Sequence, residues 1–309
     1  MGRRNAGIAL ALLAVLAAVG VGGDGVPLGG LGLALSWSPP GQERESSEGE
    51  GGRPLAFGPF HLPTERFAGG PFTGAFRALR PESARQTLEA ARAAGTQLIL
   101  NLAGSRRAFQ NPDGSFSLER FRERLERFRS LDLEPYVEDG TVIGHVLFDE
   151  PQDPTNWGGR PVPLGTIEQA AALSKALFPK LPVGIGAPAP FLRGFRWEAL
   201  DFAMAQYADR RGDLLRWLRE QTTAAEELGL GLALSLNALA GSAGGSLPPP
   251  QLREWGTLLA QEPSACALLL WKHDDAYFGR PDVAEVVAEI SAVARSRTAP
   301  GCTGAAPRS

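Results

Sequence analysis

From residue 55 onward, short apolar runs alternate with stretches in which apolar residues recur at helical spacing. Apolar, β-branched runs of about four to eight residues, bounded by turn residues, predict buried strands. We expect strands at residues 55–62, 72–78, 97–103, 142–148, 182–187, 200–206, 230–236 and 265–271. The second of these is short, and it follows the first without a full helix between them.

The stretches between these runs predict helices. Residues 81–94 open on proline and stop before Gly95, as helices commonly do. Around 120–129, Leu118, Phe121, Leu125 and Phe128 form an apolar stripe, and charged residues cover the rest. Helices are expected at residues 81–94, 120–129, 166–177, 212–228, 250–261 and 281–295.

Strands that alternate with helices predict a parallel sheet covered by helices. The folded part spans about 240 residues, close to the usual size of an eight-stranded barrel. A doubly wound open sheet is the alternative, but no glycine-rich phosphate-binding turn follows the first strand. We therefore expect a single (β/α)8 TIM-like barrel with an irregular first βα unit, and no cofactor.

The N-terminus has the layout of a secretory signal peptide. Arg3 and Arg4 precede an apolar run at 8–21 that is too short for a comfortable membrane span. We predict a signal peptide at 1–23, a disordered linker at 24–53, the barrel at 54–297 and a C-terminal tail at 298–309. The expected location is secreted or extracytoplasmic, and an uncleaved N-terminal segment is the alternative that would attach the chain to a membrane.

Charge and cysteine content add two expectations. The 31 basic and 34 acidic residues form no basic stripe, so nucleic acid is not an expected partner. Cys266 opens the last strand at the N-terminal rim of the barrel, and the following helix returns the chain to that rim just before Cys302. We therefore predict a disulfide between them, which an oxidising compartment would favour.

The run VIGHVLFDEP, residues 142–151, delivers two adjacent acids to the end of a strand. In a parallel barrel this end carries the active site. Glu150 is therefore the leading candidate for a catalytic acid, with Asp149 beside it. The alternative is structural: Asp149 would cap the next segment, and Glu150 would pair with an arginine.

Apart from the fourth strand, nearly all of the predicted strands also end in polar or aromatic residues. Sugars present apolar faces ringed by hydroxyls, so aromatic platforms beside amides and carboxylates suit carbohydrate. The candidate substrate-binding residues are His61, Asn101, Trp157, Gln206, Tyr207, Asn237, Trp271 and His273. Trp217 and Trp255 fall inside predicted helices, where burial is expected.

With Glu150 ending the fourth strand, Tyr207 the sixth and Trp271 the eighth, the chain resembles the barrel glycoside hydrolases of the large retaining clan. That resemblance implies an oligo- or polysaccharide ligand and assigns Glu150 the role of general acid/base. The resemblance in strand order spans most of residues 55–293, whereas the resemblance in motif rests on these few residues.

One position departs from this pattern, because Asn237 stands where the family has its nucleophilic glutamate. Both retaining and inverting hydrolases need a second carboxylate within about 10 Å of the acid. Asp274 is the predicted substitute, beside Asp275. Otherwise the chain is a non-catalytic carbohydrate-binding barrel. A metal-dependent hydrolase using His61, His273 and Asp149 or Asp274 ranks third, since the spacing matches no metal motif and no metal site is predicted.

Overall fold

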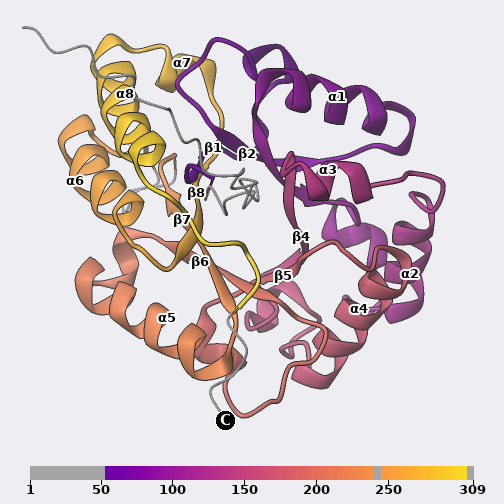
Figure 1. The fold of residues 1–309 in the computed structure, drawn as a ribbon. Helices are drawn as coiled ribbons and strands as arrows, with labels where there is room; N and C mark the ends of the chain where they lie inside the picture. Colours follow the sequence, from indigo (N-terminus) through magenta and orange to yellow (C-terminus); the bar gives the residue numbers. More distant parts are fainter. Residues whose placement is uncertain (1–52, 240–244, 305–309) are drawn as a thin grey trace, which may run out of the picture. The chain divides into compact units, whose positions relative to one another are not determined.

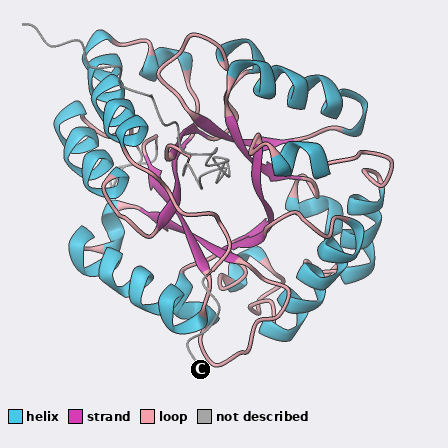
Figure 2. Cartoon of the chain, viewed as in Figure 1, coloured by secondary structure: helices cyan, strands magenta, loops and turns pink. Residues whose placement is uncertain are grey.

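The computed structural model describes residues 53–239 and 245–304. Eight parallel strands form one sheet in the order β1-β8-β7-β6-β5-β4-β3-β2. A bridge between Phe60 and Phe76 joins β1 to β2, so the sheet closes into a barrel (Figures 1 and 2). The predicted TIM barrel is confirmed. The strands are β1 (Ala56–Pro59), β2 (Gly74–Ala78), β3 (Gln97–Asn101), β4 (Val142–Asp149), β5 (Val183–Gly186), β6 (Phe202–Tyr207), β7 (Gly231–Asn237) and β8 (Ala265–Trp271).

Helices surround the strands as an outer ring (Figure 2). Only a 3₁₀ turn, η1 (Thr64–Arg66), separates β1 from β2, which is the expected irregular first unit. The helices are α1 (Ala84–Ala94), α2 (Leu118–Glu126), α3 (Glu134–Glu138), α4 (Leu164–Leu177), α5 (Leu214–Leu228), α6 (Pro249–Ala260), α7 (Asp275–Phe278) and α8 (Pro281–Ser296). The short α3 and α7 were not expected from the sequence.

Local sequence sets several helix ends. The Asp213 carboxylate accepts a 2.7 Å hydrogen bond from the Arg216 N–H, so α5 begins at Leu214 rather than at residue 212. Gly95 ends α1 in the left-handed conformation, with φ of 66°, as a residue without a β-carbon readily does.

The barrel interior is filled by large side chains. Phe60, Phe76 and Phe202 lie there with smaller apolar residues from the other strands. Gly184 makes room for Phe202, because a β-carbon on this glycine would lie 2.3 Å from the ring. The remaining apolar side chains pack between sheet and helices in a second, larger cluster.

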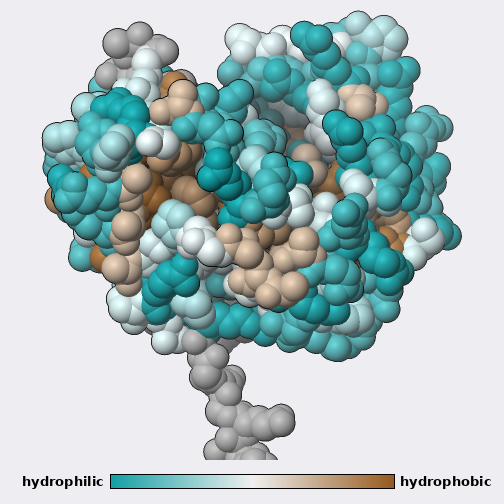
Figure 3. Space-filling view, turned by 90° about the horizontal axis from the view of Figure 1, so that it is seen from above, coloured by the Kyte–Doolittle hydropathy of each residue, from teal (hydrophilic) through white to brown (hydrophobic). Residues whose placement is uncertain are grey.

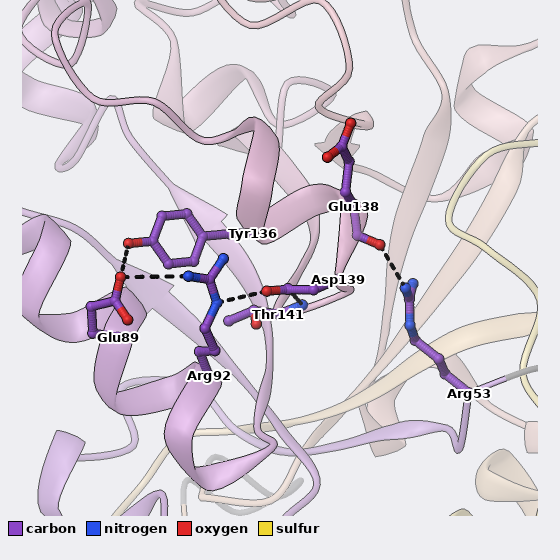
Figure 4. Close-up of polar contacts among 7 residues, drawn as sticks. All are labelled: Arg53, Glu89, Arg92, Tyr136, Glu138, Asp139 and Thr141. Carbon is purple, nitrogen blue, oxygen red and sulfur yellow. Dashed lines mark hydrogen bonds and ion pairs between the residues drawn. The ribbon is translucent and has the colours of Figure 1, made fainter.

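Polar contacts fasten the N-terminal end of the barrel (Figure 4). The Arg92 Nε donates to the Asp139 carboxylate at 2.6 Å, and its guanidinium lies 4.1 Å from the centre of the Tyr136 ring. The Tyr136 hydroxyl in turn donates to Glu89 at 2.5 Å. These contacts tie α1 to the segment that leads into β4.

The C-terminal tail returns to this same end of the barrel. Cys266 and Cys302 form the predicted disulfide, with a Cα–Cα distance of 5.2 Å. The Ala299 N–H donates to the Arg53 carbonyl at 2.8 Å, so residues before β1 and after α8 lie side by side. The tail is therefore fixed to the barrel over the part that the structure describes.

The predicted signal peptide and all but the last residue of the predicted linker lie outside the described residues. Within the described ranges, no helix is both long enough and apolar enough to cross a membrane.

Candidate functional site

The C-terminal ends of the strands form a mouth at the end of the barrel that faces away from the viewer in Figure 1. In the side-on view of Figure 3 this end is the upper edge, where the surface is hollowed between groups of hydrophilic residues. Side chains alternate along a strand, so Asn101 continues the interior face of Ile99, Gln206 that of Met204 and Trp271 that of Leu269. The last interior-facing position of each of these strands therefore carries a polar or aromatic residue.

A β-bulge near the end of β4 decides which acid enters the mouth. Val146 pairs with Gly184 and Asp149 with Gly186, so three steps on β4 match two on β5. The extra residue lets Phe148 turn outward, with its ring centre 4.7 Å from that of Phe116. Asp149 then faces inward: a β-carbon on Gly186, on the same face as Gly184, would lie 2.4 Å from its Oδ1.

The Asp149 carboxylate is accessible to solvent yet lies deep among protein atoms in the mouth. This desolvation, followed by the negative charge of Glu150, raises its pKa from 3.8 to about 7. A 3.1 Å hydrogen bond from the Glu150 N–H and the charge of Arg106 act in the opposite direction. Asp149 can therefore hold or release a proton near neutral pH.

Glu150 follows in the left-handed backbone conformation, with φ of 51°, which is unusual for a residue with a side chain. Its N–H donates to the Gly186 carbonyl at 2.7 Å. The Asn156 Nδ2 donates to its Oε2 at 2.7 Å, and the Trp157 Nε1 donates to its carbonyl at 2.8 Å. The loop after β4 thus fixes both the backbone and the carboxylate of Glu150.

An aromatic surface lies at the ends of β1 and β8. Trp271 is partly buried, with its ring centre 5.1 Å from that of Phe60 and 5.9 Å from that of His61. Its peptide bond to Lys272 is cis. Burial, and then the charges of Lys272 and Arg77, lower the pKa of His61, so its imidazole is neutral at neutral pH.

The amide side chains at the mouth differ in their burial and in their hydrogen bonds. Asn101 is engaged with its own loop, because its Oδ1 accepts from the Gly104 N–H at 2.7 Å. Gln206 is partly buried and makes no side-chain hydrogen bond to any residue that the structure describes. Asn237 is buried and lies beside Trp271 in the sheet register.

Two predicted sugar-binding residues lie elsewhere. Tyr207 is 1% exposed and packs between sheet and helices against Trp217 and Trp255, with its hydroxyl bonded to the Gly212 carbonyl at 2.5 Å. Its position next to the inward-facing Gln206 turns it outward. Trp157 is 2% exposed, inside a cluster of phenylalanines that includes Phe148. Both rings form part of the core, as those of Trp217 and Trp255 do, so their contact with a sugar stays a prediction that this packing does not support.

The residues after Trp271 lead into α7. His273 is stacked on Phe278, with ring centres 6.0 Å apart. The Asp274 carboxylate caps α7 by accepting from the Tyr277 N–H at 2.8 Å. Its approach to Glu150 within about 10 Å stays a prediction.

Sequence analysis missed three residues that shape the mouth. Gly186 leaves the space that Asp149 fills. Arg106, in the loop after β3, acts on the Asp149 carboxylate, and Lys272 acts on His61. The position of Lys272 directly after a strand-end tryptophan was a usable indication, whereas nothing in the local sequence distinguishes Arg106 from the many other arginines.

In the part of the chain that the structure describes, no three His, Cys, Asp or Glu side chains come together as a metal-dependent hydrolase would require. His145 faces the helix layer, with its Nδ1 3.1 Å from the Ser174 Oγ. Complete burial lowers its pKa to about 3, so it is a neutral core residue.

Comparison with known proteins adds evidence on the fold. The sequence matches no family profile and no curated protein. A glucosidase from Croceicoccus marinus is similar in structure, with 14% identity, a TM-score of 0.53, and coverage of 78% of this chain and 67% of that one. A GH113 β-1,4-mannanase matches with 13% identity, a TM-score of 0.51, and coverage of 74% and 90%.

Gas2p of Saccharomyces cerevisiae, in complex with laminaripentaose, matches with 15% identity and a TM-score of 0.50, over 80% of this chain and 62% of that one. At such low identity these likenesses establish the fold alone. They show that the protein shares its barrel fold with these three proteins.

Proposed function

We propose that this chain is an exported carbohydrate-active barrel, a glycoside hydrolase in which the Asp149–Glu150 pair supplies the general acid/base. The observation that carries the proposal is the position of these adjacent acids at the mouth, where the pKa of Asp149 is raised to about 7. Protonation near neutral pH is what acid catalysis of glycosidic bond cleavage requires. The similar structures, a glucosidase, a mannanase and Gas2p in complex with laminaripentaose, support a carbohydrate ligand. The disulfide is consistent with export.

In this proposal Asp149 holds a proton near neutral pH, because burial and the negative charge of Glu150 raise its pKa, and it supplies this proton to Glu150. Glu150, with its carboxylate held by Asn156, passes the proton to the leaving oxygen. Trp271 supports an apolar face of the sugar. Gln206 is available to bind a hydroxyl.

The second carboxylate distinguishes hydrolysis from binding. Asn237 occupies the end of β7 and cannot act as a nucleophile or a base, which favours the non-catalytic alternative. Asp274 is the proposed second acid, although it also caps α7.

A panel of β-glucan and β-mannan oligosaccharides, including laminaripentaose, tests the proposal. Binding measured by calorimetry, together with product analysis on the same samples, separates the two functions. Binding with new reducing ends supports a hydrolase, and binding without products supports the carbohydrate-binding alternative. Absence of binding across the panel would contradict both.

A further inference from the structure

A cleft of about 430 Å³ lies between the β1–β2 connection and the helices α7 and α8. The regular barrel repeat places a helix after each strand, but only the short η1 follows β1. The connection leaves Ala284, on the first turn of α8, exposed at the edge of the cleft. Figure 3 looks onto this side of the barrel, where hydrophobic side chains show in a recess.

The lining of the cleft is apolar and rich in rings. Leu62 and Val287 are buried at its floor, and Phe72 and Phe278 are only partly buried. The Phe72 and Phe278 ring centres are 5.8 Å apart, with the rings at 87° to each other. The ring of His273 lies nearly parallel to that of Phe278, with centres 6.0 Å apart. An aromatic occupant would add edge-to-face or stacked contacts to this set, which an aliphatic one cannot make.

The charged residues that line the cleft are at its rim. Arg66 pairs with Asp275 at 3.0 Å, and both side chains are largely exposed. The same Asp275 oxygen lies 3.4 Å from the His273 Nε2. Glu65 is the other charged lining residue, and it is exposed. The rim thus offers no unpaired cation, and a charged ligand would lose hydration over the apolar floor. These features favour an uncharged occupant.

The size of the cleft limits the occupant to a small molecule or group. Its volume falls within the range of small-molecule sites, about 300–1,000 Å³. A closed apolar cavity of about 150 Å³ already holds benzene. One or two fused rings therefore fit, whereas a stable protein partner would need roughly 800 Å² of surface on each side.

We infer that this cleft binds an uncharged aromatic group of one or two rings. The inference goes beyond the proposed function and does not depend on it. Leu62 directly follows His61, and His273 lies two residues after Trp271, so the cleft begins beside the aromatic surface of the mouth. The aromatic group has two available sources, a free compound or the aglycone of a glycoside whose sugar lies on Trp271.

Calorimetric titration with 2-naphthol tests the inference, beside its saturated counterpart decahydro-2-naphthol and the anion 2-naphthoate. We expect 2-naphthol to bind roughly three- to tenfold more tightly than the saturated compound, and 2-naphthoate to bind more weakly than 2-naphthol. No saturable binding of 2-naphthol would overturn the inference. Equal or tighter binding of either comparison compound would overturn its aromatic or its uncharged character.

Three variants locate the binding. Ala284→Trp places a large side chain at the edge of the cleft from an exposed position, and it should weaken 2-naphthol binding by roughly tenfold or more. Ala288→Trp is the matched control: Ala288 is exposed one turn further along α8 and does not line the cleft, so wild-type affinity is expected. Phe278→Leu keeps an apolar side chain and should abolish the preference for 2-naphthol over the saturated compound. Unchanged affinity in Ala284→Trp together with an unchanged preference in Phe278→Leu would place the binding elsewhere and overturn the inference.

The source of the aromatic group is identified by 2-naphthyl β-glucoside, titrated beside 2-naphthol and methyl β-glucoside. An affinity for the naphthyl glucoside at least tenfold above that for either comparison compound would identify an aglycone. An affinity no greater than that for 2-naphthol would identify a free aromatic compound. Failure of the sugars to bind would count against the proposed function and leave the aromatic site standing.

Discussion

The Asp149 carboxylate occupies the space that a side chain on Gly186 would fill, with Oδ1 2.4 Å from the position of the absent β-carbon. The bulge in β4 turns Asp149 inward, and Gly186 on β5 leaves room for its carboxylate because it has no side chain. The acid at the mouth thus depends on a residue of the neighbouring strand.

Gly186→Ala should displace Asp149 from this position. The added methyl group would meet the carboxylate and the Asp149 backbone, so we expect a loss of about 1–3 kcal/mol in the free energy of unfolding and at least a tenfold loss of hydrolysis. Gly165→Ala in α4 is the control, because its methyl group would make an ordinary contact at 3.7 Å with Phe195. Wild-type activity in Gly186→Ala would show that the position of Asp149 is unimportant.

Asp149 should make stability depend on pH. Its pKa is raised from 3.8 in the unfolded chain to about 7 in the folded protein, so the folded state binds the proton more tightly. The resulting stabilisation is complete below pH 3.8 and is lost as the pH rises through about 7. Asp149→Asn removes this dependence. The free energy of unfolding of Asp149→Asn minus that of wild type should therefore be larger above pH 7 than in acid. The expected increase is about 1 kcal/mol after allowing for solvent screening of this accessible group.

Denaturant unfolding of both proteins across that pH range measures this difference. Asp153→Asn is a control of opposite sign, because hydrogen bonds from Thr155 lower the pKa of Asp153. The stabilisation from Asp153 is complete above its unfolded-state pKa and is lost as the pH falls through the lower folded-state pKa. A wild type and an Asp149→Asn variant with parallel pH profiles would contradict the assignment.

The Cys266–Cys302 disulfide should stabilise the barrel by closing a loop of 36 residues. Replacing both cysteines with alanine removes that constraint on the unfolded chain and should lower the free energy of unfolding by about 3 kcal/mol. Thiol titration of the denatured, unreduced protein should find no free thiol. Two reactive thiols would show that the pairing is absent.

Trp271→Ala should weaken oligosaccharide binding by roughly tenfold or more, since it removes the partly exposed aromatic surface at the mouth. Trp197→Phe is the control, because Trp197 packs on Phe195 and donates to the Leu192 carbonyl in the segment between β5 and β6. Calorimetric titration of both variants provides the comparison, and equal losses of affinity would argue against a specific role for Trp271.

The fold could be predicted from the sequence because each strand is an apolar run bounded by turn residues, and such runs survive small errors in their limits. The site was less accessible. The run before Asp149 is apolar on both faces of β4, so nothing in its alternation reveals the bulge that turns Phe148 outward. Tyr207 stands at a strand end and Trp157 stands in a loop, where sugar-binding residues commonly lie, but both rings pack in the core. Direction of a side chain at a strand end is a property of packing, which sequence position alone does not fix.

The most direct test of the acid/base pair is hydrolysis by Glu150→Gln beside wild type, with the affinity of each for the same oligosaccharide measured in parallel. The amide can still accept the hydrogen bond from Asn156 through its oxygen, so the fold and ligand binding should persist, but it cannot donate a catalytic proton. The account predicts that Glu150→Gln binds as wild type does and releases reducing ends at least a hundredfold more slowly, consistent with the usual size of acid catalysis. Turnover equal to that of wild type in this variant would contradict the central claim.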